Sequence, residues 1–144
     1  MASDNNDNNK NNDDHAKQEN MNEVKSVSLS NDKFSTKLYD LLRRKHQNLV
    51  FSPFSLSVVM AMLSAGARGE TLKKIKKVLF FPSSTILQAQ YKNIIPAIRS
   101  TQDFTIETVN KVFVKNGFPF FRTFERILFK SFHSKIKRID VSNR

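Results

Sequence analysis

The chain has 144 residues, of which 24 are Lys or Arg and 13 are Asp or Glu, so its formal net charge is +11. Apolar residues make up 39% of the sequence, which is enough for one globular domain. There is no cysteine, so disulfides, cysteine-based metal sites and a cysteine nucleophile are excluded.

The first 25 residues differ in composition from the rest. They hold six acids, three bases, many asparagines and almost no branched or aromatic side chains. Such a segment buries too little surface to offset the entropy lost on ordering, so we expect residues 1–25 to be a disordered tail. The segment also lacks the apolar core of a secretory signal peptide, which predicts a cytoplasmic protein for the sequence as written. Residues 26–144 carry a net charge of +14 and form the predicted globular part.

The globular part begins with a predicted amphipathic helix. It starts behind Ser30, Asn31 and Asp32, which can cap a helix N-terminus, and ends near the basic residues 43–45. Its apolar residues recur at helical spacing: Phe34, Leu38, Leu41 and Leu42. Residues 48–51 are too few for a helix and predict a short strand.

Three more helices are predicted before the pattern changes. Ser52 is expected to cap the first of them, with Pro53 at its first position and its end near Ala67. The other two cover residues 72–79, behind Thr71, and residues 86–98.

From residue 104 the hydrophobic period is two. This predicts a long strand over residues 104–115, closed by a turn at Asn116 and Gly117. A short helix over 124–132 and a strand over 135–141 follow. Consecutive helices followed by strand, helix and strand favour an α+β fold over alternating βαβ units.

The predicted helix from Pro53 is apolar on every face, which is typical of a membrane span or of the interior of a larger protein. A span needs roughly 20 apolar residues. This run is shorter and contains serines, so no membrane span is expected. The helix therefore predicts more protein packed around it than the other predicted elements supply.

The same stretch carries a family resemblance. The run Asn48–Ser57, NLVFSPFSLS, is similar to the N-terminal signature of serpins, the serine protease inhibitor superfamily. Other segments match in the family's order: Lys33-Phe34, Leu38-Tyr39, Ala61–Leu63, Gly66-Ala67, Gly69–Thr71, Val109–Val114, Phe132–Ser134 and Ile139–Val141. Together they extend over residues 29–143.

The resemblance implies a truncated serpin fold, with the N-terminal helices, two strands of the main sheet and an incomplete core. A serpin inhibits a serine protease by offering a reactive-centre loop near its C-terminus as bait. Residues 26–144 would end before the family's sixth helix and lack that loop, so this chain alone is not expected to inhibit. The family's usual location is extracellular, which is the alternative to the cytoplasm.

A second hypothesis is a non-inhibitory binding module. Strand edges left unpaired by the truncation would pair with another serpin chain.

Four residues match the family's shutter, where hydroxyl groups at the start of the buried helix help to hold the central strands together: Asn48, Ser52, Pro53 and Ser55. Local capping by Ser52 and Pro53 explains the same residues without a shutter.

Four lysines form a possible polyanion contact: Lys73, Lys74, Lys76 and Lys77. Heparin-like glycans, nucleic acid or an anionic membrane would be the partners. The alternative is the solvated face of an amphipathic helix, with bases in a first turn that oppose the helix dipole. In glycan-binding serpins the bases lie chiefly on the following helix, which here offers only Lys92 and Arg99.

Enzymatic chemistry has little support in the sequence. His15, His46 and His133 are isolated, and no metal-ligand spacing, nucleophile elbow or phosphate-binding glycine loop occurs. We therefore expect no catalytic residues, no metal and no cofactor.

Overall fold

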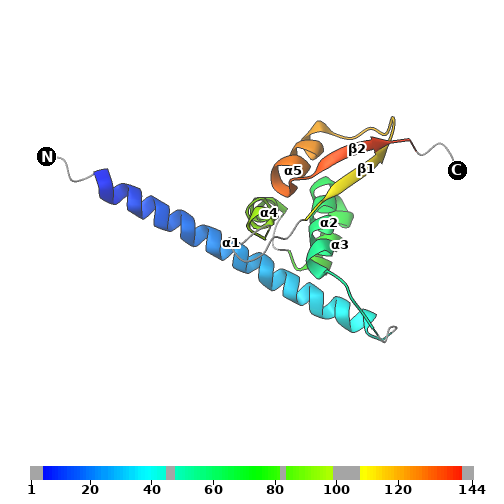
Figure 1. Ribbon diagram of the computed structural model, residues 1–144, viewed down its shortest axis with the longest axis horizontal. Helices are drawn as coiled ribbons and strands as arrows, with labels where there is room; N and C mark the ends of the chain where they lie inside the picture. Colours follow the sequence, from blue (N-terminus) through cyan, green and yellow to red (C-terminus); the bar gives the residue numbers. More distant parts are fainter. Residues whose placement is uncertain (1–4, 45–47, 82–83, 99–107, 141–144) are drawn as a thin grey trace.

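The computed structural model describes residues 5–44, 48–81, 84–98 and 108–140. In this part of the chain the elements are α1 (Asn5–Leu42), α2 (Pro53–Gly66), α3 (Gly69–Leu79), α4 (Ser84–Ile98), β1 (Lys111–Lys115), α5 (Arg122–Phe132) and β2 (Lys135–Ile139). Helices 2 to 5 and the two strands gather at one side of the long helix α1 (Figure 1). The predicted α+β class is confirmed, with helices and a partial sheet.

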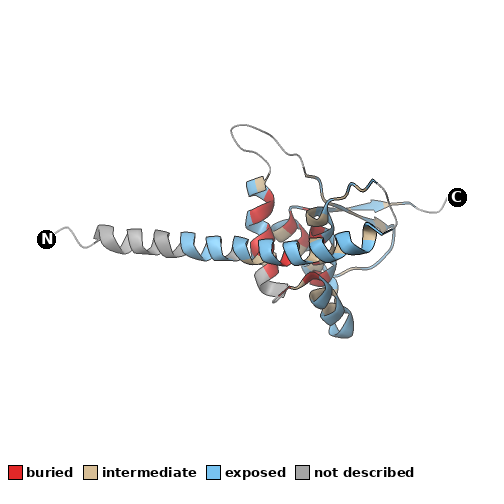
Figure 2. Ribbon diagram, turned by 90° about the horizontal axis from the view of Figure 1, so that it is seen from below, coloured by how far each residue is buried: buried red, intermediate tan, exposed pale blue. Residues whose placement is uncertain are grey.

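Helix α1 extends in one piece across the other elements and beyond them toward the N-terminus (Figure 2). The prediction that it starts behind Ser30 is wrong, because α1 begins at Asn5. Ser30 is buried inside the helix, with its hydroxyl 3.0 Å from the Ser26 carbonyl and 3.1 Å from the Phe80 carbonyl. The hydroxyl therefore joins α1 to the end of α3 instead of capping a helix start.

The N-terminal part of α1 has no buried side chain among those described between residues 17 and 25. This agrees with the low apolar content of the segment. The disorder of residues 1–25 in solution stays a prediction.

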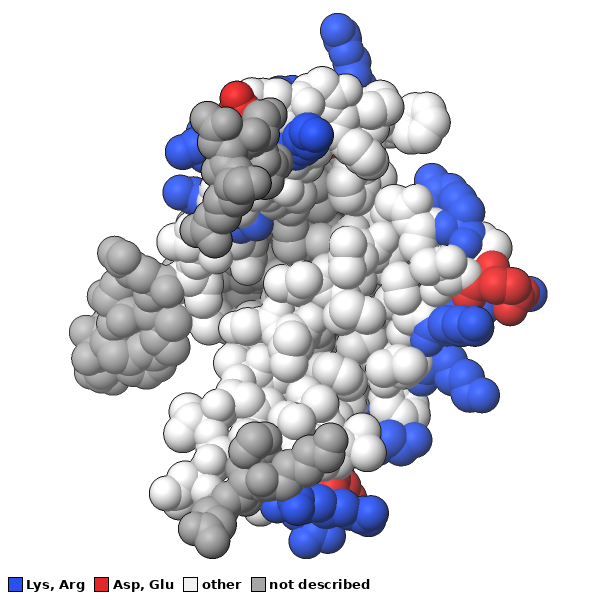
Figure 3. Space-filling view, turned by 90° about the vertical axis from the view of Figure 1, so that its right-hand side faces the viewer, with Lys and Arg blue, Asp and Glu red and all other residues white. Residues whose placement is uncertain are grey.

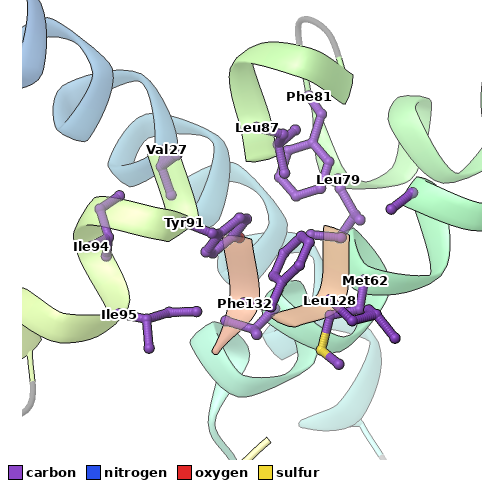
Figure 4. Close-up of a cluster of buried hydrophobic side chains, with 13 residues drawn as sticks. Val27, Met62, Leu79, Phe81, Leu87, Tyr91, Ile94, Ile95, Leu128 and Phe132 are labelled. Atoms are coloured by element: carbon purple, nitrogen blue, oxygen red, sulfur yellow. The ribbon is translucent and has the colours of Figure 1, made fainter. Parts of the chain in front are cut away.

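The core lies where α1, α2, α4, α5 and the end of α3 meet (Figure 4). Tyr91 of α4 is at its centre, with its ring centroid 5.6 Å from that of Phe132, 6.3 Å from Phe54 and 6.4 Å from Phe81. Tyr91, Leu79, Leu128 and Phe132 have no exposed surface. Since aromatic rings bury the largest areas, this cluster supplies much of the hydrophobic stabilisation of the described part.

The helix boundaries after α1 follow the local signals closely. Helix α2 starts at Pro53 and ends at Gly66, as predicted. Helix α3 begins at Gly69, two residues before the predicted cap Thr71. Helices α4 and α5 cover the predicted segments.

Strands β1 and β2 form a two-stranded parallel sheet, in which Lys111 is opposite Lys135 and Lys115 is opposite Ile139. Helix α5 is the crossover between them, so the α+β chain contains one βαβ unit at this end. Gly117, with φ of +80°, allows the turn after β1, and a side chain there would be strained.

Three strand predictions need correction. The strand predicted over 135–141 ends earlier, because β2 stops at Ile139 and Asp140 is outside it, while residue 141 lies outside the described residues. Of the strand predicted over 104–115, only Lys111–Lys115 pairs within the described residues, and residues 104–107 lie outside them. The strand predicted over 48–51 is wrong, because these residues have no regular structure and Val50 is fully exposed. So short a strand needs a neighbour to pair with, and the described part provides none there.

Candidate functional site

The start of α2 gathers three of the four residues predicted from the family shutter. Ser52 is the N-cap, and its Oγ accepts a hydrogen bond from the Ser55 backbone N–H at 3.2 Å. The two hydroxyls are 2.9 Å apart. Pro53 occupies the first helical position, where a missing N–H leaves no hydrogen bond unmade. These contacts are the predicted local cap.

Both hydroxyls are exposed, so nothing in the described part of the chain covers the cap. Asn48, the fourth predicted residue, lies exposed in the segment before the helix, and no contact of its side chain with the cap is found among the described residues. A shutter role for Asn48, Ser52, Pro53 and Ser55 stays a prediction.

A second polar contact lies one turn further into α2, and the sequence did not reveal it. The Tyr91 hydroxyl donates to Ser57 Oγ at 3.1 Å, and Ser57 Oγ donates to the Phe54 carbonyl at 2.8 Å. Burial raises the pKa of Tyr91 to about 12, while its hydrogen bond with Ser57 acts in the opposite direction. The periodicity of α4 could have marked Tyr91 as buried, but its partner could not be read from the sequence.

Helix α2 is buried on one side only. Its buried residues are Ser57, Val58, Ala61, Met62, Ser64 and Ala65. Leu56, Val59 and Leu63 are 44%, 47% and 53% exposed. The helix that the sequence marked as apolar all round therefore keeps an uncovered apolar stripe.

The four α3 lysines lie on the surface of a helix whose start was predicted too late. Glu70 is in the first turn, and Lys76 and Lys77 are in the last turn, where positive charge is favourable. The expected conflict with the helix dipole is therefore wrong. Lys73 Nζ is 2.7 Å from Glu70 Oε1. Lys74 and Lys77 are exposed and Lys76 is half-buried.

Charge is distributed unevenly over the face shown in Figure 3. A broad area without charged side chains occupies its middle, and Lys and Arg lie around its edges, at the top, the upper left, the right and the bottom.

Of the three histidines, only His133 has a side chain among the described residues. His133 ends α5 with φ of 50°, and its Nε2 is 3.2 Å from the Lys92 carbonyl oxygen. His46 and the side chain of His15 lie outside the described residues. Where the structure is described, no three His, Asp or Glu side chains are grouped closely enough to hold a metal. No helix among the described residues is long and apolar enough to cross a membrane.

Comparisons with known proteins agree on one family. The sequence model of the serpin family, described as serine protease inhibitors, matches residues 29–144. The chain therefore belongs to the serpin family.

Among its relatives, an uncharacterized serpin-like protein of Methanosarcina acetivorans is 29% identical over 124 residues, covering 82% of this chain and 29% of that protein. Neuroserpin of Gallus gallus is 29% identical over 113 residues, covering 75% of this chain and 28% of that protein.

Solved structures agree with the sequence relatives. The mouse protein-Z dependent protease inhibitor has a TM-score of 0.70 and 29% identity, covering 84% of this chain and 35% of that one. The chain spans less than a third of the length of the Methanosarcina acetivorans protein and of Gallus gallus neuroserpin.

Proposed function

We propose that this chain is the N-terminal part of a serpin-type inhibitor of serine proteases, and that residues 1–144 do not inhibit a protease by themselves. The observation that carries the proposal is the half-exposed stripe of Leu56, Val59 and Leu63 on α2, within a family match over residues 29–144. Exposed apolar side chains in a row on a central helix require further protein to cover them. A role as an inhibitor, without enzymatic activity, is what the family match supports. Cytoplasmic localisation stays a prediction.

The proposal is tested by detecting the native product and challenging it with serine proteases. We expect a product well above 16.6 kDa that forms a complex with a protease which survives denaturing electrophoresis. Purified residues 1–144 should form no such complex with the same proteases. A complex formed by the 144-residue chain would contradict the proposal.

We propose further that Ser52 and Ser55, with Pro53 and Asn48, act as the shutter of the complete inhibitor. Their exposure at the start of α2 supports this, since the hydroxyls are free to meet further strands. The test is the ratio of protease complex to cleaved inhibitor. Ser55→Ala should shift this ratio, whereas a purely capping role should leave it unchanged.

A binding module is the second candidate, because β1 and β2 pair only with each other in the described part of the chain. Each strand therefore has a free edge that another serpin chain can extend. A 16.6 kDa native product that co-elutes with a full-length serpin at fixed stoichiometry would favour this candidate. A product of serpin size would exclude it.

For Lys73, Lys74, Lys76 and Lys77 we propose that the solvated surface of α3 also contacts polyanions weakly. The test is the salt concentration at which the protein elutes from a heparin column. A Lys74→Gln, Lys77→Gln double variant should elute earlier than a double variant with Lys111→Gln and Lys135→Gln, which removes the same charge from the sheet. If the two double variants elute at the same salt concentration, the α3 lysines have no specific role in binding polyanions.

A further inference from the structure

A pocket lies between the end of α2 and the start of α5. Its volume is about 370 Å³. The residues that line it are Ala65, Gly66, Arg68, Phe121, Thr123, Phe124 and Ile127. Most of the lining is apolar, and a small number of polar groups in an apolar pocket is the usual composition of a site for a small molecule.

Gly66 sets the depth of the pocket. A Cβ at this position would lie 3.1 Å from Phe124 Cε2, closer than side chains normally approach. The absent side chain therefore lets the Phe124 ring lie against α2 and leaves space beside it. Phe121, which also lines the pocket, is 82% exposed, so a ligand that covers it would remove apolar surface from water.

The polar groups that line the pocket can donate hydrogen bonds, and none is acidic. Arg68 Nη1 donates to the carbonyl oxygens of Ala67 at 2.7 Å and Ala65 at 3.2 Å, which holds the guanidinium at the end of α2. Its remaining N–H groups have no acceptor within the described residues. The Thr123 hydroxyl also lines the pocket.

We propose that this pocket binds a small amphiphilic carboxylate, with its apolar chain against Phe121, Phe124 and Ile127 and its carboxylate on Arg68. A guanidinium presents paired N–H groups that match the two oxygens of a carboxylate. The apolar lining selects against small inorganic anions, because they would leave that surface without a partner. This site is independent of protease inhibition, and it goes beyond the proposed function.

The test is calorimetric titration with octanoate, using the longest polypeptide that the native transcript encodes. Octan-1-ol, which has the same chain and no charge, is the matched ligand. We expect octanoate to bind with one site per chain, and octan-1-ol to bind at least about tenfold more weakly, because a hydrogen-bonded charge is lost.

Three variants assign the site to Arg68. Arg68→Gln should weaken octanoate binding at least about tenfold, and Arg68→Lys should restore part of it. Arg44→Gln removes the same charge from an exposed position outside the pocket and should bind as the unchanged protein does. Equal affinities for octanoate and octan-1-ol would overturn the proposal. An equal loss of octanoate affinity in Arg68→Gln and Arg44→Gln would also overturn it, and so would a product that does not unfold cooperatively. A failure of protease inhibition with octanoate binding intact would overturn only the proposed function.

Discussion

Tyr91 and Ser57 form the most consequential contact between individual residues. The tyrosine hydroxyl has no exposed surface and its hydrogen bond to Ser57 Oγ joins α4 to α2. Ser57 is also buried, and it passes the hydrogen bond on to the Phe54 carbonyl. The Tyr91 hydroxyl therefore has Ser57 Oγ as its partner, whereas Ser57 also has the Phe54 carbonyl.

Removing either hydroxyl tests this inequality. Ser57→Ala leaves the Tyr91 hydroxyl buried without its partner and should lower the free energy of unfolding by about 1–3 kcal/mol. Tyr91→Phe leaves Ser57 bonded to the Phe54 carbonyl and should lower it by about 1 kcal/mol or less. The measurement is urea unfolding of both variants beside the unchanged protein. A larger loss for Tyr91→Phe would contradict the described contact.

The raised pKa of Tyr91 predicts a dependence of stability on alkaline pH. The hydroxyl titrates near pH 12 in the folded protein and at about 10 in the unfolded chain. Below pH 10 both states keep the proton, so Tyr91 has no effect on the pH dependence of unfolding. Between pH 10 and 12 only the unfolded chain loses it, so the free energy of unfolding should fall by on the order of 2–3 kcal/mol.

The pH dependence is measured as the free energy of unfolding from pH 9 to pH 12. Tyr91→Phe should remove the part due to this residue. Tyr39→Phe, which changes the exposed second tyrosine, should leave the curve unchanged. Identical curves for the two variants would show that the burial of Tyr91 does not control the effect.

Among the elements, α2 is stabilised at its start by a single side chain. Ser52 Oγ accepts the Ser55 N–H, one of the four N–H groups that a helix start leaves without an intrahelical partner. Ser52→Ala should therefore lower the free energy of unfolding by about 0.5–2 kcal/mol. Chemical denaturation measures the change, with Ser28→Ala at an exposed position of α1 as the control. An equal loss of unfolding free energy in the Ser28→Ala control would show that Ser52 does not stabilise α2 as a cap.

Sequence and structure agree well at the level of elements. The Ser-Pro start of α2, the αL turn at Gly117 and the amphipathic α5 were predicted because each rests on contacts within a few residues. Residues 48–51 were mispredicted because a strand needs a neighbour to pair with. Ser30 was mispredicted as a cap because its hydroxyl bonds to the distant Phe80 carbonyl from inside α1.

For the whole molecule, the uncovered stripe of α2 separates a self-sufficient domain from a part of a larger one. If further protein covers the stripe in the native product, Leu63→Lys buries an unpaired charge and should lower the free energy of unfolding by several kcal/mol. If the stripe faces water, the change should be within about 0.5 kcal/mol.

The native product is again the protein to measure, by denaturant unfolding. Lys74→Leu, an opposite exchange at an exposed position of α3, should have little effect in either case. If Leu63→Lys leaves the free energy of unfolding of the native product unchanged, the proposed function is contradicted, because no further protein would then cover the stripe.

The sequence by itself determined the family, the class of fold and most helix boundaries, since periodicity, caps and turns act over short distances along the chain. It also indicated that α2 is apolar enough to lie in the interior of a protein. Only the tertiary structure decided which side of α2 is buried, that Ser57 meets Tyr91, and that Gly66 and Arg68 open a pocket toward α5. These features depend on residues far apart in sequence meeting in space, and no local pattern records which side chains will meet.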